Sequence, residues 1–115
     1  MNERRIETRA LCADLVTLGW FENSGKSNVT AAVLEDISSR GACLQTDSPL
    51  PLNVQGFIQH EAWIIGCRIS YCTYREIGYY VGVMFDADAR WSTEDFRPQH
   101  LLDLSHFNTS ESCMQ

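Results

Sequence analysis

Asp36-Ile37-Ser38-Ser39-Arg40-Gly41 joins two runs that read as β-strands, residues 28–37 and 42–46. Side chains two positions apart in extended chain lie on one face, about 6.6 Å from each other, so Asp36 and Ser38 point the same way. Gly41 can adopt a positive φ or let another group approach the backbone closely. Ile37 points away from Asp36 and is expected on the core side of the sheet, together with Val29, Ala31 and Val33.

This hexapeptide allows two interpretations. Asp, Ser and Gly are ordinary turn residues, which favours a plain connection between strands. A carboxylate that accepts N–H donors, a hydroxyl that bonds an anionic oxygen and a glycine that leaves room also suit a binding site. The N-terminal sequence favours the binding site.

Three arginines precede the first predicted strand. Arg4, Arg5 and Arg9 are a third of the nine Lys and Arg residues of an acidic chain. Arginine is well suited to phosphate, to the guanine edge and to stacking on flat rings. Arg5 and Arg9, spaced RxxxR, would be about 13 Å apart in extended chain and about 6 Å apart on one helical turn. Either spacing lets both side chains reach one ligand.

An RxxxR lead-in followed by D-x-S-x-x-G resembles the PilZ domain, a family of bacterial receptor modules for cyclic di-GMP. The run at residues 78–85 is also similar to the closing strand of that family, and the resemblance covers nearly the whole chain. The matching motif positions are Arg5, Arg9, Asp36, Ser38 and Gly41.

The resemblance implies a role for each of these residues. Arg5 and Arg9 would contact phosphate and guanine, and Asp36 would accept from the guanine N–H edge. Ser38 would bond near phosphate, and Gly41 would permit close approach. An arginine just before RxxxR is associated in PilZ-like domains with a stacked pair of ligand molecules. Arg4 is therefore a further expected ligand-binding residue, with a plain surface charge as the equal alternative.

Six short strands are expected between residues 10 and 85. This spacing predicts an all-β chain with a closed or sandwiched antiparallel sheet, and the resemblance implies a six-stranded antiparallel β-barrel of PilZ type. The expected strands are residues 10–21, 28–37, 42–46, 54–61, 63–73 and 79–85. The expected core faces of the last two are Trp63, Ile65, Cys67, Ile69 and Tyr71, and Tyr79, Val81, Val83 and Phe85.

The only helical pattern follows the last strand. Ser92 and Thr93 are candidate caps, and Pro98 fits only the first turn of a helix. An apolar stripe that would pack across one barrel opening comprises Phe96, Leu101, Leu102 and Leu104. The expected organisation is a flexible arm at 1–9, a barrel with a C-terminal helix at 10–105 and a disordered tail at 106–115.

Composition excludes several classes of function. The 115 residues are 44% hydrophobic and 21% charged, which predicts one globular domain. A net charge of −6 argues against binding to nucleic-acid polymers or anionic membranes, but not against a small anion held by local arginines. No run approaches the roughly 18 apolar residues of a membrane span, and no signal peptide is visible, so a cytoplasmic protein is expected.

The five cysteines predict no catalytic or metal chemistry. An odd count without a secretory signal suggests reduced thiols. No C-x-x-C pair occurs, and the three histidines lack a zinc-like spacing relative to the cysteines. We therefore expect no metal, no cofactor and no enzymatic activity.

The sequence thus predicts a cyclic di-GMP receptor. Binding would order the arginine arm against the barrel and signal to an unidentified protein in motility, exopolysaccharide production or signalling. One alternative is a PilZ-like adaptor that acts by protein contact without nucleotide. Another is an OB-like barrel for single-stranded nucleic acid, which the net charge and the scarcity of cations near the aromatic residues oppose.

Overall fold

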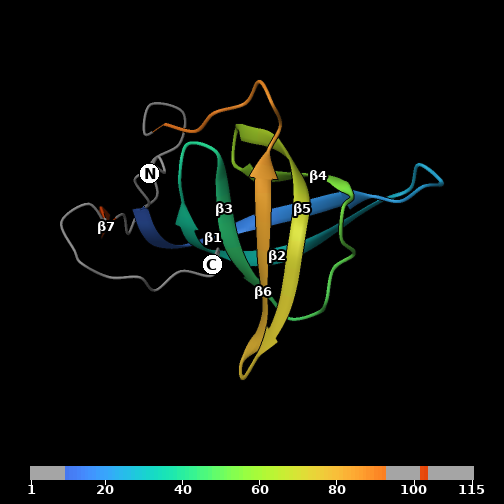
Figure 1. The fold of residues 1–115 in the computed structure, drawn as a ribbon, viewed down its shortest axis with the longest axis horizontal. Helices are drawn as coiled ribbons and strands as arrows, with labels where there is room; N and C mark the ends of the chain where they lie inside the picture. The colour runs from blue at the N-terminus through green and yellow to red at the C-terminus, as the bar shows by residue number, and fades with distance from the viewer. Residues whose placement is uncertain (1–9, 93–101, 104–115) are drawn as a thin grey trace, which may run out of the picture.

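The computed structural model describes residues 10–92 and 102–103. Seven strands occur within these ranges (Figure 1). The six strands expected from the sequence are confirmed, with ends that differ by no more than two residues. The strands are β1 Ala10–Phe21, β2 Ser27–Ile37, β3 Gly41–Thr46, β4 Gln55–His60, β5 Trp63–Arg75, β6 Gly78–Phe85 and β7 Leu102–Asp103.

The first six strands form a closed antiparallel barrel. Each hydrogen-bonds to two neighbours in the order β1-β2-β3-β6-β5-β4, and β4 returns to β1. This arrangement confirms the all-β class and the six-stranded antiparallel barrel. Closure gives every strand two neighbours, although β1, β2 and β5 each extend beyond their paired stretch on one side.

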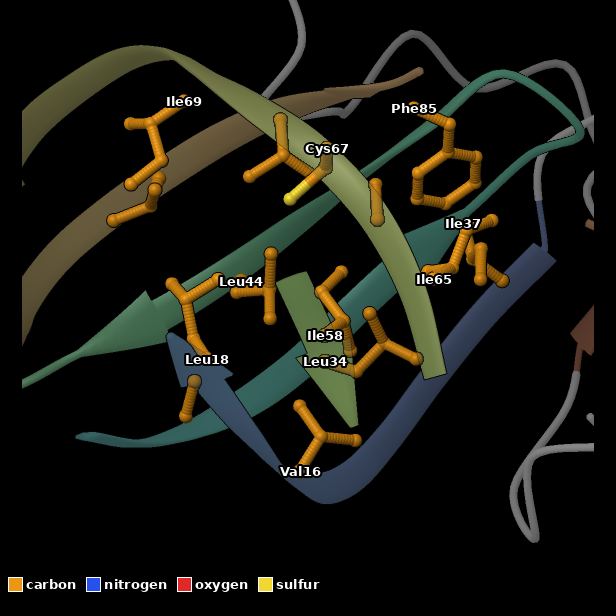
Figure 2. Close-up of a cluster of buried hydrophobic side chains, with 14 of the residues drawn as sticks. Val16, Leu18, Leu34, Ile37, Leu44, Ile58, Ile65, Cys67, Ile69 and Phe85 are labelled. Carbon is orange, nitrogen blue, oxygen red and sulfur yellow. The ribbon is translucent and has the colours of Figure 1, made fainter. Parts of the chain in front are cut away.

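All six strands contribute to one core, in which apolar side chains converge on the barrel interior (Figure 2). Full burial of one such side chain stabilises the fold by about 1.5–3 kcal/mol. The side chains with no exposed surface include Leu18, Leu34, Ile37, Leu44, Ile58, Ile69, Val81 and Val83.

The expected core face of β2 is wrong except at Ile37. Ala32 and Leu34 face the core, whereas Val29 is 63% exposed and Ala31 is also exposed. The reason is a β-bulge: Leu34 pairs with Leu44 and Asp36 with Cys43, so Glu35 has no opposite residue on β3. One extra residue shifts the inward–outward alternation by one position. Ile37 therefore points inward although it is out of phase with Leu34.

A second bulge corrects the expected core face of β5. Ile65, Cys67 and Ile69 face the core as predicted, but Tyr71 does not belong to the core cluster. The register shifts at Ser70, whose hydroxyl donates to the Gly82 carbonyl at 2.9 Å. Beyond the bulge, Cys72 packs against the core in place of Tyr71.

In β6 the expected core face is confirmed at Val81, Val83 and Phe85. Tyr79 lies instead at the end of the β5–β6 hairpin, half-buried, with its ring 5.2 Å from that of Tyr74. The apolar alternation of this strand therefore ends one position short of the hairpin.

Residues 10–92 and 102–103 contain no C-terminal helix. Leu102 and Asp103, which fall within the helical pattern, form β7 and pair with Leu11 and Ala10 of β1. β1 is twelve residues long but pairs with β4 only from Thr17 to Trp20, so its first residues present backbone groups that β7 satisfies.

Residues 10–92 contain no helix, so none there is long and apolar enough to cross a membrane. The remainder of the helical pattern, including Phe96, Pro98, Leu101 and Leu104, lies outside the described residues. The predicted arm at 1–9 and tail at 106–115 also lie outside them.

Candidate functional site

The D-x-S-x-x-G motif forms the end of β2, the β2–β3 turn and the start of β3. The backbone N–H of Ser38 donates to the Gly41 carbonyl at 2.8 Å and closes the turn. The Ser38 hydroxyl lies 3.4 Å from the same carbonyl and accepts from the Arg40 N–H at 3.3 Å. Both hydroxyl contacts are long for hydrogen bonds, so they hold the side chain weakly.

Gly41 allows a close approach, but the approaching group belongs to the protein itself. A Cβ at this position would lie 2.5 Å from the Val83 carbonyl oxygen of β6. Gly41 is not among the positive-φ residues, so close packing rather than backbone conformation explains the glycine. The motif glycine thus has a structural reason that is independent of any ligand.

Asp36 is a buried carboxylate at the last-but-one position of β2. It pairs with Leu11 of β1 and Cys43 of β3, and its side chain is 3% exposed. Because the following residue, Ile37, faces the core, the Asp36 side chain lies on the outer side of the barrel wall. Ser38, 8% exposed, follows in the turn. A ligand that contacts either group must displace what now covers it.

The surroundings of Asp36 are acidic. Burial, followed by the charges of Asp14, Asp36 and Glu35, raises the pKa of the Cys12 thiol to about 12. Burial also raises the pKa of Glu35. Three carboxylates therefore act on the same buried thiol near the beginning of β1. An anionic ligand at this end of the barrel would need cations from elsewhere in the chain.

Two of these acids escaped the sequence-based site prediction. Asp14 alternates in phase with the core residues Cys12 and Val16, and a polar residue in a core phase is a signal that could have identified it. Glu35 occupies the bulge, and its position follows from pairing between strands, which one sequence does not reveal.

The expected arginines, Arg4, Arg5 and Arg9, lie outside the described residues. What the structure gives is the place where they join the barrel. Ala10 pairs with Ile37, and Leu11 pairs with Asp36, so β1 begins beside the end of β2 (Figure 1). Arg9 is bonded to Ala10, which sets their Cα atoms about 3.8 Å apart. The described part of β1 thus begins beside the D-x-S-x-x-G turn at one end of the barrel.

The segment after β6 holds the turn from its other side. The N–H of Phe85 donates to the Arg40 carbonyl at 2.8 Å, and the N–H of Trp91 donates to the Ser39 carbonyl at 3.0 Å. Trp91 packs into the core cluster. The sequence suggests Trp91 only as a neighbour of the apolar stripe in the helical pattern, and its hydrogen bond to the β2–β3 turn was not expected.

Two of the described cysteines, Cys12 and Cys67, have raised pKa values, so neither thiol is a nucleophile at neutral pH. Burial and the charge of Asp86 raise the pKa of Cys67 to about 12. Cys12, Cys67 and Cys72 are free thiols, but Cys43 is disulfide-bonded. The expectation that all thiols are reduced is therefore wrong at Cys43. Within residues 10–92 and 102–103 no group of three or more His, Cys, Asp and Glu side chains could hold a metal ion.

No protein-family model matches the chain, and no curated protein matches it.

Proposed function

We propose that this chain is a non-enzymatic receptor for cyclic di-GMP, built on a β-barrel of PilZ type. The observation that carries the proposal is the pairing of Ala10 and Leu11 with Ile37 and Asp36. This register starts β1 beside the D-x-S-x-x-G turn, and the RxxxR segment precedes β1 directly in the sequence, which supports a common site. The closed six-stranded barrel supports the proposal, because it is the architecture that the resemblance implies.

The chemistry of this end of the barrel fits a guanine nucleotide with added arginines. Asp36 is an acceptor for the guanine N–H groups, and the Ser38 hydroxyl, whose two turn contacts are long, is a donor for a phosphate oxygen. Asp14, Glu35 and Asp36 would repel the phosphates of a ligand that arrived alone. Arg5 and Arg9 would compensate by charge-assisted bonds to phosphate and guanine, and Arg4 would add a third cation if two ligand molecules stack.

Signalling would follow from the ordering of residues 4–9 on the barrel. The entropy lost in that ordering would be offset by the arginine bonds to the ligand. The new surface would recruit or release a partner protein in motility, exopolysaccharide production or signalling. We place the receptor in the cytoplasm. The three free thiols agree with that location, whereas the disulfide at Cys43 weighs against it.

A second candidate is an adaptor of the same fold that binds no nucleotide. The burial of Asp36 and Ser38, and the packing reason for Gly41, favour it. Each of these residues would then be explained by the turn and the barrel wall alone.

Isothermal titration with cyclic di-GMP separates the two candidates. The wild type, Arg9→Ala and Asp36→Asn are compared with Arg75→Ala, a control that removes an arginine stacked on Tyr80 at the β5–β6 hairpin. The receptor predicts binding by the wild type and the control, and affinity lower by roughly tenfold or more in the two site variants. Cyclic di-AMP should not bind, because adenine lacks the N1–H donor that Asp36 would accept.

A stoichiometry near two ligands per chain would include Arg4 in the site, and a stoichiometry near one would exclude it. If the folded wild type gives neither heat nor a thermal shift, the receptor proposal is wrong. The adaptor then becomes the better account.

A further inference from the structure

A row of residues on the outer wall of the barrel is buried, although it faces away from the core. Opposite residues of an antiparallel pair lie on the same side of the sheet, so successive pairings define such a row. We call it the covered row. Its members, each paired with the next, are Asp36 of β2, Cys43 of β3, Gly82 of β6 and Tyr71 of β5.

The covered row faces outward because its neighbours along the strands face inward. Ala42 and Leu44, on either side of Cys43, belong to the core cluster, whereas Cys43 does not. The two valines on either side of Gly82 belong to it as well. Successive side chains of a strand point to opposite faces, so the row lies on the outer side. The Tyr71 ring lies against this side of Gly82, where it would meet an added Cβ. 

The burial of these outward side chains contrasts with the rest of the outer wall. Cys43 has no exposed surface and Asp36 is 3% exposed. Outward residues elsewhere, such as Leu15 and Met84, are 66% and 55% exposed. The hydroxyl oxygen of Tyr71 is buried as well. Other groups of the chain must therefore lie over this part of the wall.

The disulfide at Cys43 indicates which part of the chain covers the row. A disulfide holds the Cα atoms of its two cysteines about 5.5–6 Å apart, so the bonded partner must lie against the outer wall at Cys43. The sequence has five cysteines, of which Cys12, Cys67 and Cys72 are free thiols. The one cysteine that remains as a partner within the chain is Cys113.

The position of β7 makes this bond possible. β7 pairs with the start of β1, the start of β1 pairs with the end of β2, and the end of β2 pairs with β3 at Cys43. Three strand spacings of about 4.8 Å set β7 about 14 Å from Cys43. Cys113 follows Asp103, the last residue of β7, by ten positions, which span at most about 33 Å. The chain between them is therefore long enough.

We propose that a disulfide between Cys43 and Cys113 holds the C-terminal segment over the covered row and closes the site at Asp36 until the bond is reduced. This inference rests on the proposed nucleotide site. Cys43 lies directly opposite Asp36, and the Cβ atoms of opposite residues are about 4.5–5.5 Å apart. A guanine that contacts the Asp36 carboxylate needs the space that the disulfide and its flanking residues fill. The oxidised chain is thus the closed form, and the reduced chain is the open form.

Opening requires a reductant, and a dithiol such as dithiothreitol supplies it. One thiolate of the dithiol attacks a sulfur of the disulfide and displaces the other cysteine, which takes up a proton. The second thiol of the reductant then breaks the mixed disulfide and closes into a cyclic disulfide. The dithiol is oxidised by two electrons, and Cys43 and Cys113 become two thiols.

Peptide mapping by mass spectrometry tests the bond itself, on the full chain oxidised in air and digested without reductant. The expected product is one pair of peptides joined through Cys43 and Cys113, from a protein that runs as a monomer on a non-reducing gel. A Cys43 that is joined to another cysteine or to a second chain, or that is not joined at all, overturns the proposal.

Alkylation of the native protein tests the cover without any nucleotide. In folded Cys113→Ser the C-terminal segment is no longer tied to Cys43, so the Cys43 thiol should become accessible. It should be alkylated at least about tenfold faster than Cys67, a thiol inside the core. Equal rates for Cys43 and Cys67 would show that the C-terminal segment does not cover the row.

Isothermal titration with cyclic di-GMP tests the regulation, on oxidised protein and on protein reduced with dithiothreitol. The reduced wild type should bind at least about tenfold more tightly than the oxidised wild type, because only the open form is competent to bind. Cys113→Ser should bind like the reduced wild type under both conditions. Ser112→Ala is the matched control: it changes the adjacent residue, keeps the thiol and should retain the full redox difference.

Thermal melts separate a regulatory bond from a purely structural one. A structural disulfide would raise Tm in the oxidised form and leave the affinity for the nucleotide unchanged, and that result overturns the proposal. If neither redox form binds cyclic di-GMP, the proposed receptor is wrong. The mapping and the alkylation of Cys43 then still decide whether the C-terminal segment covers the row.

Discussion

The β1–β2 and β5–β6 hairpins are both long, apolar and interrupted by a bulge, yet their sequences predict them unequally well. In the β5–β6 hairpin, inward residues such as Ile69 and Val83 alternate with outward residues such as Arg68 and Met84. In β2 the outward Val29, Ala31 and Val33 are as apolar as the inward Ala32 and Leu34.

The position of the bulge decides how much of the prediction survives. The bulge at Ser70 comes after three correctly placed core residues and misplaces only Tyr71. The bulge at Glu35 separates Ile37 from the rest of β2, so a phase deduced from Ile37 is wrong for every preceding residue. Hydrophobic alternation fixes a register only where one face is polar and the strand is regular.

The largest expected effect is on thiol chemistry along β5. A pKa raised from 9.0 to about 12 lowers the thiolate fraction of Cys67 at pH 8 by roughly a thousandfold. Cys72, half-buried beyond the bulge, should be modified by a disulfide reagent in the folded protein. Cys67 should react only when the protein unfolds. Peptide mapping by mass spectrometry distinguishes the two sites. Equal modification rates for Cys67 and Cys72 in the native protein would contradict the burial that the Ser70 bulge gives these residues.

The next effect concerns the two faces of β2. Leu34→Ala should lower the free energy of unfolding by about 2–5 kcal/mol, because Leu34 is completely buried. The adjacent Val33→Ala should cost less than about 1 kcal/mol, since Val33 lies on the outer side. Urea denaturation measures both. A larger loss of unfolding free energy for Val33→Ala than for Leu34→Ala would show that Val33 faces the core, as the sequence predicted, and would contradict the bulge at Glu35.

A smaller effect is expected from adding one methyl group at a glycine. Gly41→Ala should cost about 3 kcal/mol, because the new carbon would meet the Val83 carbonyl and the backbone must move. Gly66→Ala on β5 is the control, where the new carbon would meet the Asp86 carboxylate, a side chain that can rotate away. Its cost should be about 1 kcal/mol or less. Similar losses for both variants would mean that β3 and β6 are not in close contact at Gly41.

The smallest effect is the pH dependence from Glu35. Burial raises the pKa of Glu35 above the ordinary 4.5. As pH rises from 4.5 to the higher pKa of the folded state, the unfolded state releases this proton more readily than the folded state does. The free energy of unfolding therefore falls as pH rises through this range. Glu35→Gln should therefore raise Tm slightly at pH 7, by about 1–2 °C, and by less at pH 4. Differential scanning calorimetry at both values checks this, with Glu76→Gln in the β5–β6 turn as control. A Tm difference that does not change with pH would refute the assignment.

Most of the fold is readable from this sequence, because turn residues and apolar runs mark six strands independently of one another. Which side chains of β2 face the core is not readable, because the bulge depends on how β2 pairs with β1 and β3. β7 is not readable either: Leu102 and Asp103 join a helical pattern in sequence, and only the open edge of β1 explains their pairing.

Only the part of the candidate site that lies within one sequence motif could be predicted. Asp36, Ser38 and Gly41 are brought together by one turn, so proximity in sequence sufficed. The pairing of Ala10 with Ile37, which starts β1 beside that turn, depends on the sheet register. The arrangement of acids around Cys12 depends on it as well, and their charges oppose an anionic ligand.

The most direct test of the receptor is an amide nitrogen–proton NMR spectrum of the labelled chain, recorded with increasing cyclic di-GMP. The account predicts shifts at the amides of Ile37 to Gly41, at Ala10 and Leu11, and at the Trp91 indole. The amides of the β5–β6 hairpin tip, at Tyr74 and Tyr79, should not move. No shift at any amide, or shifts confined to the hairpin tip, would contradict the receptor.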